Sequence, residues 1–361
     1  MQNAAGPLPQ AAGRKPPAVQ VRIPPRLWYL EKGFTRSFDA GARHMTWLHR
    51  SAVFLCACTL ALLLAGALVS STGSGLALPG WPSLAAGTEP AAGAGLQLTH
   101  RLLAALVGLL AILVAALAWR SDPRPWMKGL SVAAVALVVG QAVYGGLAVV
   151  SLLPAYFSVF HAALAQLFFG LTVAMALFTS EGWLERERGR AAQSDPALAR
   201  WALASTIAIY VQVLVGATMR HSYVADGRPG GLAIPDYPLA FGQVLPLGEL
   251  GSSIVAVAFL HRLVALVTAA LVAVTVARVY RRHAGEGGLV KPASLLALLV
   301  ATQIALGGLA VLSGMTPLVT TMHAGVVGIA LAASLILLLR AGAPAPLAQA
   351  GPRDNLTDAP A

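Results

Sequence analysis

Eight long apolar runs constrain this chain more than any other feature. They lie at about 52–71, 98–119, 129–151, 157–179, 201–219, 254–280, 291–313 and 318–340. Each has about the 20 residues that an α-helix needs to cross a bilayer. Hydrophobic residues make up 57% of the 361 residues and charged residues only 11%, and a soluble fold could not bury that much apolar surface. The sequence therefore predicts an all-α membrane protein with eight transmembrane helices.

Lysine and arginine are distributed unevenly between the two sides that these runs would separate. All but four of the 25 fall on the side of the termini, the exceptions being Arg101, Arg220, Arg228 and Arg262. Basic residues favour the cytoplasmic side of a membrane. We therefore expect a multi-pass protein of the cell inner (plasma) membrane with both termini cytoplasmic and with loops 72–97 and 220–253 outside. The net charge of +11 has this topological explanation, and no basic patch interleaved with aromatic residues indicates nucleic acid.

The sequence also contains an internal repeat. Three segments of the first half recur in the second: Gln141–Val149 as Gln303–Val311, His100-Arg101 as His261-Arg262, and Gly75–Pro82 as Gly231–Pro238. The offset that aligns the first of these segments, 162 residues, also carries His161 onto His323. An even number of helices in each copy keeps both copies in one orientation. We therefore predict two tandem four-helix bundles.

The repeat and the flanking composition predict the domain boundaries. They are a cytoplasmic N-terminal tail with an interfacial segment at 1–50, an N-terminal bundle at 51–180, a cytoplasmic linker at 181–200, a C-terminal bundle at 201–340 and a cytoplasmic tail at 341–361. The interfacial segment is inferred from mixed aromatic and basic residues between 26 and 50. Residues 1–25 are rich in Pro, Ala and Gly and lack the apolar stretch of a signal peptide.

Four of the eight histidines lie inside apolar runs, where an imidazole is costly and usually functional. They are His100, His161, His261 and His323. Each falls in the first turns of a span that enters from the outside, so we expect all four at one depth, with one pair in each repeat. Two facing imidazoles in a helix bundle can hold a haem iron axially. We predict these four residues as iron ligands, although a histidine that only makes structural hydrogen bonds is the alternative at each position taken singly.

Arginine and glycine residues flank the histidines. Arg101 and Arg262 are predicted to pair with haem propionates, because a guanidinium group binds a carboxylate through two hydrogen bonds. Snorkelling to the membrane interface is the alternative for both. The pairs Gly145-Gly146 and Gly307-Gly308 would let a helix or a porphyrin approach closely. His283, in contrast, sits among arginines in a predicted cytoplasmic segment, and we expect it in solvent.

Together these motifs resemble the haem A synthase family. The resemblance rests on the duplicated His-Arg pair, the duplicated histidine hairpin, and a Thr72-Gly-Ser-Gly-Leu segment that leads to Pro79-Gly-Trp81-Pro82 in the first outer loop. It covers about residues 48–340. It implies a membrane oxidoreductase that converts haem O to haem A for cytochrome oxidase biogenesis. The C8 methyl group would become a formyl group by successive hydroxylations on the outer side of the membrane.

The resemblance also assigns roles to residues and implies partners. His261 and His323 would hold a haem b cofactor in the C-terminal half, and electrons would pass through it. His100 and His161 would hold the substrate haem in the N-terminal half, with Gln97 and His100 at the catalytic positions. The implied partners are haem O, the haem O synthase (a farnesyltransferase), cytochrome oxidase assembly factors and the lipid bilayer.

This sequence departs from the family pattern in the first outer loop. Gln97 stands where the family commonly has a Glu, and a glutamine cannot ionise to act as a base. Glu89 is the nearby carboxylate that could replace it. The cysteine pair that many members carry in this loop is absent. Three other functions therefore stay open: a non-catalytic haem-binding paralogue, a di-haem b-type electron-transfer protein and a transporter, the last disfavoured because four histidines at one depth fit a fixed cofactor better than a pathway.

Overall fold

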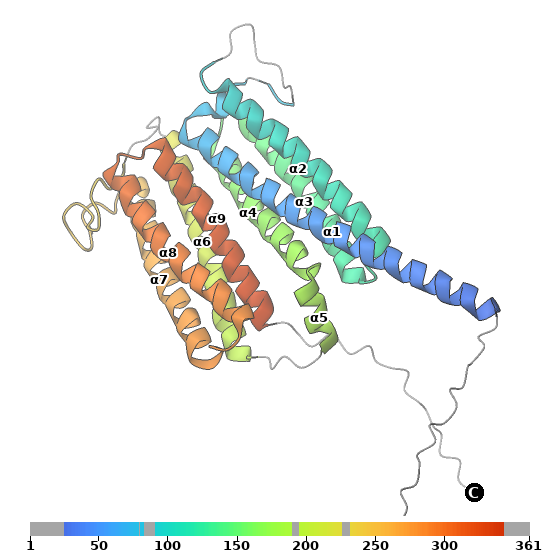
Figure 1. Cartoon of the computed structure of the whole chain (residues 1–361). Coiled ribbons are helices and arrows are strands. Elements are labelled where there is room, and N and C mark those ends of the chain that lie inside the picture. The colour runs from blue at the N-terminus through green and yellow to red at the C-terminus, as the bar shows by residue number, and fades with distance from the viewer. Residues whose placement is uncertain (1–24, 79, 83–90, 190–194, 226–231, 343–361) are drawn as a thin grey trace, which may run out of the picture. The chain divides into compact units, whose positions relative to one another are not determined.

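The computed structural model describes residues 25–78, 80–82, 91–189, 195–225 and 232–342. Within these ranges side chains are described from residue 45 onward, except at 188–189 and 223–225. Within these ranges the chain forms helices and no strand. The helices are α1 (Pro25–Ser71), α2 (Ala94–Ser121), α3 (Pro125–Val150), α4 (Ala155–Phe178), α5 (Glu181–Gly189), α6 (Pro196–Ala225), α7 (Ser253–Arg282), α8 (Gly287–Leu312) and α9 (Pro317–Ala341), with a 3-10 turn at Ser74–Leu76. Figure 1 shows the long helices side by side.

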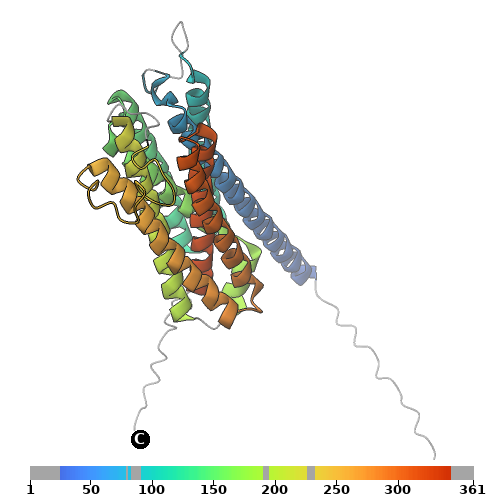
Figure 2. The ribbon, with the colours of Figure 1, turned by 90° about the vertical axis from the view of Figure 1, so that its left-hand side faces the viewer.

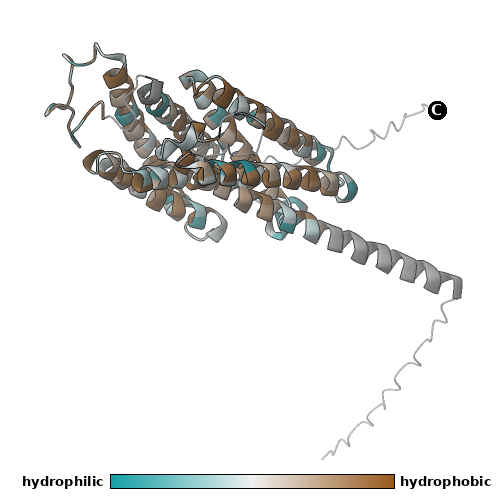
Figure 3. Ribbon diagram, turned by 90° about the horizontal axis from the view of Figure 1, so that it is seen from above, coloured by the Kyte–Doolittle hydropathy of each residue, from teal (hydrophilic) through white to brown (hydrophobic). Residues whose placement is uncertain are grey.

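Eight of the helices are long and apolar enough to cross a membrane, which confirms the predicted number of spans. The spans are Met45–Ser71, Ala94–Ser121, Pro125–Val150, Ala155–Phe178, Pro196–Ser222, Ser253–Arg282, Gly287–Leu312 and Pro317–Ala341. Most of their ends lie beyond the ends of the predicted apolar runs, because helical hydrogen bonding continues past the last apolar side chain, but three spans end one residue earlier than predicted, at Val150, Phe178 and Leu312. Apolar residues cover most of the length of these helices, as Figure 3 shows. The chain is therefore an all-α, multi-pass membrane protein.

Helices of the first half share one apolar core, and helices of the second half share another. The first core joins α1 to α4 through residues such as Leu55, Val107, Met127 and Phe168. The second joins α6 to α9 through residues such as Ile209, Val272, Leu296 and Leu337. Helix α4 also packs against α6 and α9, and Figure 2 gives a second view of these helices. This packing fits the predicted tandem bundles, whose boundaries stay a prediction.

The two hairpins that carry the second histidine of each half are built alike. The turn between α3 and α4 places Leu152 and Leu153 in the left-handed region, and the turn between α8 and α9 does the same with Gly314 and Met315. These turns also repeat a hydrogen bond, from the Leu153 N–H to the Ala148 carbonyl (2.7 Å) and from the Met315 N–H to the Ala310 carbonyl (2.8 Å). The sequence repeat is therefore a repeat of backbone conformation in these turns.

Several sequence predictions concern residues outside the described ranges. These are the N-terminal tail at 1–24, Glu89 in 83–90, the part of the linker at 190–194, Arg228 in 226–231 and the C-terminal tail at 343–361. The rest of the predicted linker is described, and it contains α5 and the start of α6. The predicted interfacial segment is part of α1, and its place at the membrane surface stays a prediction.

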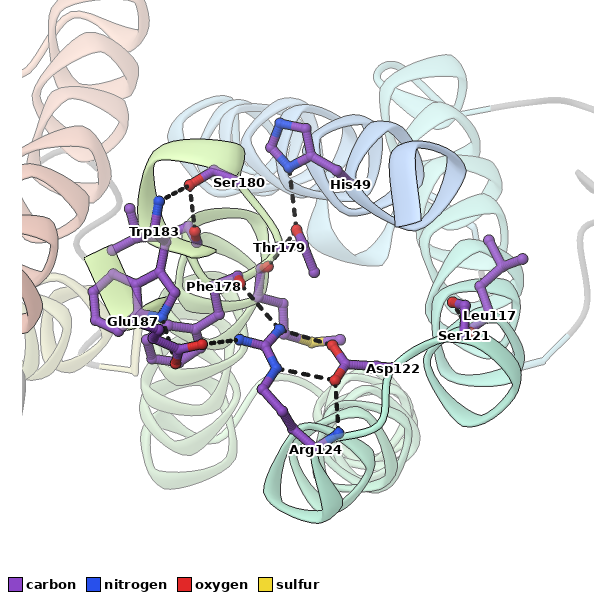
Figure 4. A network of polar contacts seen from close by, with 12 residues as sticks. His49, Leu117, Ser121, Asp122, Arg124, Phe178, Thr179, Ser180, Trp183 and Glu187 are labelled. Atoms are coloured by element: carbon purple, nitrogen blue, oxygen red, sulfur yellow. Dashed lines mark hydrogen bonds and ion pairs between the residues drawn. The ribbon is translucent and has the colours of Figure 1, made fainter. Parts of the chain in front are cut away.

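A buried ion-pair network links the α2–α3 turn to α4 and α5 (Figure 4). The Asp122 side chain is completely buried, and its carboxylate binds Arg124 at 2.7 Å. Arg124 also binds Glu187 at 3.0 Å and donates a hydrogen bond to the Phe178 carbonyl at 3.0 Å. Glu187 in turn accepts a hydrogen bond from the Trp183 ring nitrogen at 2.9 Å. Because a buried charge is stabilised only by such partners, this network fixes one end of the first half.

A second ion-pair cluster joins α6, α7 and α8. Asp195 caps the start of α6 and binds Arg278 at 2.8 Å and His283 at 3.0 Å, while His283 also binds Glu286 at 2.7 Å. The expectation that His283 lies free in solvent is therefore wrong, because its ring nitrogens face two carboxylates. The hydrogen bonds with Asp195 and Glu286 raise the pKa of His283, and the hydrogen bond from Arg278 lowers the pKa of Asp195.

These shifts predict a stability plateau in mildly acidic solution. The pKa of His283 is higher in the folded than in the unfolded state, so its contribution is complete below about pH 6.5 and disappears as the pH rises through the folded value. The pKa of Asp195 is lower when folded, so its contribution is complete above about pH 4 and disappears as the pH falls through the folded value. We expect the melting temperature of the detergent-solubilised protein to fall on either side of that window.

Substitution of His283 tests the cause of the expected fall in melting temperature at alkaline pH. His283→Gln should lower the melting temperature by a few degrees at about pH 6 and reduce its further fall toward about pH 9, because the titrating partner of Asp195 is gone. The acidic arm should persist, since the Asp195–Arg278 pair remains. Equal alkaline slopes for the variant and the wild-type protein would show that His283 does not cause the loss.

Candidate functional site

All four predicted histidines lie near the first turns of their helices, at the end of the bundle opposite the two ion-pair clusters. His100 is in α2, His161 in α4, His261 in α7 and His323 in α9. These helices all begin at the same end, because successive spans cross in alternating directions. Each half therefore presents one pair of imidazoles at a common depth, as the repeat predicts.

A glycine of a neighbouring helix lies directly against each imidazole. A Cβ atom on Gly66 would lie 3.0 Å from the His100 ring, and one on Gly145 would lie 2.9 Å from the His161 ring. In the second half, a Cβ on Gly216 would lie 3.0 Å from the His261 ring. The fourth such contact, between Gly307 and His323, is looser at 3.4 Å. The two halves thus also share the glycine contacts of their histidine rings.

The two imidazoles of the second half lie close together. The ring centroids of His261 and His323 are 6.4 Å apart, with an angle of 66° between the ring planes. Two imidazoles that bind one iron axially, with bonds of about 2 Å, would have centroids roughly 6 Å apart. Nδ1 of His323 is buried and has no hydrogen-bond partner. This pair therefore fits an axial ligand set for one haem iron.

In the first half, His161 has a defined hydrogen bond. Its Nδ1 lies 3.0 Å from the backbone carbonyl oxygen of Gln141, which can only accept a hydrogen bond. That contact places the ring proton on Nδ1 and leaves the Nε2 lone pair available for a metal. Nδ1 of His100 is buried without a hydrogen-bond partner.

A porphyrin would supply the ligands that the protein does not. Within the described ranges, no three His, Cys, Asp or Glu side chains gather as a metal site. A structural zinc site usually has four protein ligands and a catalytic one has three. An iron bound by two imidazoles takes its other four nitrogens from a porphyrin, so paired histidines without further ligands favour haem over a bare metal ion.

Each outer loop packs one aromatic ring against the second glycine of a Gly-Gly pair. A Cβ atom on Gly146 would clash with the Trp81 ring, and one on Gly308 would lie 2.7 Å from the Tyr237 ring. The first glycine of each pair therefore contacts a histidine and the second contacts a loop. This arrangement couples the position of the outer loops to the histidine hairpins.

The two arginines next to the histidines bind the same loops. Arg101 donates hydrogen bonds to the carbonyls of Leu78 and Gly80, both at 3.0 Å. Arg262 donates to the carbonyls of Asp236 (2.8 Å) and Leu239 (2.6 Å). Both guanidinium groups thus hold loop backbone in this structure, and the predicted contact with haem propionates stays a prediction.

Gln97 is buried, and both ends of its amide are used. Its side-chain oxygen accepts a hydrogen bond from the Leu78 N–H, and its side-chain nitrogen donates to the Gly75 carbonyl at 2.5 Å. Gln97 therefore joins α2 to the 3-10 turn at Ser74–Leu76 and to the loop that carries Trp81. Because both amide atoms bind loop backbone and neither carries charge, the predicted catalytic role of Gln97 has no support in this geometry and stays a prediction.

Comparison with known proteins places these features in a family. The sequence pattern of a family described as cytochrome oxidase assembly protein matches residues 96–336, which include all four histidines. The chain belongs to the haem A synthase family. A heme A synthase from Halalkalibacterium halodurans is 31% identical over 284 residues, covering 74% of this chain and 88% of that protein. Heme A synthases from Shouchella clausii and Rhizorhabdus wittichii are 29% and 30% identical, covering 70% and 65% of this chain and 83% and 68% of those proteins.

Sequence reasoning missed some residues of this haem A synthase family site. Gly66 and Gly216, which contact the first histidine of each half, were not identified, although each stands in a Leu-x-Gly-Ala segment of the span that opens its half. Gln212 of α6 was also missed, and its side-chain nitrogen lies 3.1 Å from Nδ1 of His261. The internal repeat was the signal for the glycines, whereas no repeated residue marks Gln212.

The role of Gln97 predicts a stability effect in this haem A synthase family member. Gln97→Met keeps the volume but leaves the Leu78 N–H and the Gly75 carbonyl without partners, so we expect a loss of about 1–3 kcal/mol in the free energy of unfolding. Thermal melting in detergent measures the change, and Gln243→Met on the exposed outer loop is the control. If both variants had the melting temperature of the wild-type protein, the hydrogen bonds of Gln97 between α2 and the first outer loop would not stabilise the fold.

Proposed function

We propose that this chain is a haem A synthase: a membrane oxidoreductase that converts haem O to haem A by oxidising the C8 methyl group to a formyl group, for cytochrome oxidase. The observation that carries the proposal is the close pair of His261 and His323, with ring centroids 6.4 Å apart. The equivalent pair of the first half lies at the same end of the bundle. Membership in the family and three heme A synthase relatives support the reaction class.

The two halves take different haems in this proposal. His261 and His323 hold a haem b cofactor, which supplies one-electron redox chemistry when bound. His100 and His161 hold haem O as the substrate. The Nδ1–H of His161 donates its hydrogen bond to the Gln141 carbonyl, so the ring keeps one orientation toward the iron. Arg101 and Arg262 keep the outer loops against the Gly-Gly pairs. In this proposal they also bind the haem propionates, because a guanidinium group suits a carboxylate.

The proposed orientation places both termini in the cytoplasm and both histidine pairs near the outer face of the inner (plasma) membrane. The distribution of lysine and arginine supports it, since most lie on the side of the termini. A haem O synthase, which is a farnesyltransferase, is the partner that must supply the substrate. Cytochrome oxidase assembly factors are the partners that receive the product.

The decisive experiment is product analysis. The full chain is expressed in membranes together with a source of haem O, and the extracted haems are separated by chromatography and identified by mass. Haem A or its alcohol precursor is the expected product, and the His100→Ala protein should yield neither. Recovery of unmodified haem alone, from protein that carries its full complement of haem, would refute the synthase.

A non-catalytic haem carrier is the second candidate, and one observation favours it. Gln97 has no ionisable group, and both atoms of its amide form hydrogen bonds with the loop backbone. The first half therefore has no carboxylate at that position. A carrier would bind haem through the same histidines and release it unchanged. If wild-type protein releases only unmodified haem but Gln97→Glu yields the alcohol, the missing carboxylate is the reason, and the carrier becomes the better description of the natural chain.

A further inference from the structure

The second outer loop carries apolar side chains that stay exposed among the described helices. They belong to residues 239–247, where Val244 is 83% exposed and Leu247 is 69% exposed. The other exposed apolar side chains of this segment are Leu239, Phe241 and Leu245. The segment contains no ionisable residue, and the nearest charged residues are Asp236 and Glu249. An exposed apolar patch of this kind marks a surface that contacts lipid or another protein.

The internal repeat does not account for these apolar residues. It aligns the two outer loops as far as Pro82 and Pro238. The first loop then continues as Ser83-Leu-Ala-Ala-Gly-Thr-Glu89-Pro, with one large apolar residue, whereas the second continues as Leu239-Ala-Phe-Gly-Gln-Val-Leu-Pro-Leu247. A segment that only connects two helices does not need large apolar side chains on its surface. The second loop therefore has a contact surface that the first loop lacks in its sequence.

The second loop packs along the first turns of α7, inside a membrane span. One apolar cluster joins it to that helix, formed by Ile234, Ala240, Val255, Ala258 and Phe259. Arg262 of α7 binds the backbone carbonyls of Asp236 and Leu239, and the Tyr237 ring lies against Gly308, near the end of α8. The loop therefore folds back beside the ends of two spans, where Figure 1 shows it.

The exposed surface of the loop borders the lipid-facing surface of α7. Leu263 is exposed, and it follows Phe259 by four residues, so the two side chains are neighbours on the helix. Phe259 packs against the loop, whereas Leu263 points away from the bundle core. Leu312 and Leu318, on either side of the α8–α9 turn, are also exposed and apolar. The lipid that covers these side chains is therefore next to the loop.

The backbone of the loop is suited to a surrounding with little water. Ala240 and Gln243 exchange two backbone hydrogen bonds, at 2.8 and 3.0 Å, across a turn of two residues with positive φ. The N–H groups of these two residues, Phe241 and Gly242, donate to the Asp236 carboxylate at 2.8 and 2.7 Å. Non-helical backbone is tolerated at membrane depth only where its polar groups have partners. The turn can therefore enter the membrane interface without leaving these peptide groups unpaired.

We propose that residues 239–247 insert into the lipid leaflet at the histidine end of the bundle and anchor the second outer loop to the bilayer. Lipid is favoured over a protein partner because the patch continues a lipid-facing surface and has Gln243 as its one polar side chain, whereas protein interfaces have a polar rim. Held by Arg262 on one side and by lipid on the other, the loop keeps the Tyr237 ring against Gly308. This inference goes beyond the proposed function and does not depend on haem.

Spin labels measure the surroundings of this segment. Cys56 and Cys58 are the only cysteines of the chain, so Cys56→Ala with Cys58→Ala gives a background in which a nitroxide label is attached at Val244→Cys or Leu247→Cys. The full chain is reconstituted in vesicles of phosphatidylethanolamine and phosphatidylglycerol. Paramagnetic resonance then measures how often the label collides with oxygen, which concentrates in lipid, and with a nickel chelate, which stays in water.

We expect the ratio of oxygen to nickel collisions at Val244→Cys and Leu247→Cys to be several times higher than at Glu249→Cys, an exposed control in the same loop. It should approach the ratio at Leu266→Cys, an exposed position on α7. A ratio equal to that of Glu249→Cys would place the patch in water and overturn the proposal. A label that collides with neither reagent would lie under a protein partner or a second copy of the chain, which overturns it as well.

A test on the wild-type chain covers the case in which the labelled variants do not accumulate. The same vesicles are prepared with a phospholipid that carries a photoreactive group on its acyl chain. Illumination should attach this lipid to the peptide that contains residues 239–247, as well as to the spans. Adducts confined to the spans would show that the loop stays out of the bilayer.

Discussion

Replacing His323 by alanine should remove one low-spin haem from the purified protein. The ring centroids of His323 and His261 are 6.4 Å apart, and an iron held by both, as proposed, would lose one of its two protein ligands in the variant. The loss should be larger than that of an ordinary contact, because in the proposed site two metal–nitrogen bonds would hold the haem in addition to packing. We expect the content of C-terminal haem to fall to less than about a tenth of the wild-type value.

Optical spectroscopy and haem extraction of His323→Ala measure this effect. His261→Ala should have the same result, because the two histidines would hold one iron. His283→Ala is the control, since His283 belongs to the ion-pair cluster at the other end of the bundle. If His323→Ala and His261→Ala each kept the wild-type spectrum and haem content, the axial pair would be wrong and the proposed function would lose its main support.

Much of the fold follows from the sequence, because a membrane makes secondary structure almost independent of tertiary contacts. Each span satisfies its own backbone hydrogen bonds, so an apolar run of the right length is sufficient to predict it. The helix ends and α5 were not predicted, because they depend on polar contacts between segments distant in the chain. Trp183 of α5, for example, binds Glu187 within a network that also includes Asp122, about 60 residues earlier.

The candidate site, like the fold, could be predicted only in part from the sequence. The histidines were found because an imidazole inside an apolar run is conspicuous, and the repeat paired them. The carbonyl contacts of Arg101 and Arg262 were not found, because a backbone acceptor leaves no trace in the residue types. Gln97 was assigned by analogy to a catalytic position, while its burial between Leu78 and Gly75 depends on a loop conformation that the sequence does not encode locally.

The glycines of α3 provide the second large effect, because they allow a test within one helix. Gly146→Ala places a methyl group inside the Trp81 ring, so the Trp81 side chain must move. Gly140→Ala changes the same helix where a Cβ would meet no atom within 4 Å. The control should stabilise the protein by roughly 0.5–1 kcal/mol, since alanine favours a helix over glycine. Overpacking costs about 1–3 kcal/mol, so Gly146→Ala should be destabilised overall.

Melting temperature and haem content together test whether the glycine–aromatic contacts hold the outer loops in place. Displacement of Trp81 also disturbs the loop that Arg101 and Gln97 hold, so Gly146→Ala should lose haem from the first half while the C-terminal haem stays bound. Gly308→Ala should do the reverse, since a Cβ there would lie 2.7 Å from the Tyr237 ring of the second loop. Two variants that melt like Gly140→Ala, with both haems retained, would mean that the aromatic rings rest on the glycines without constraining either loop.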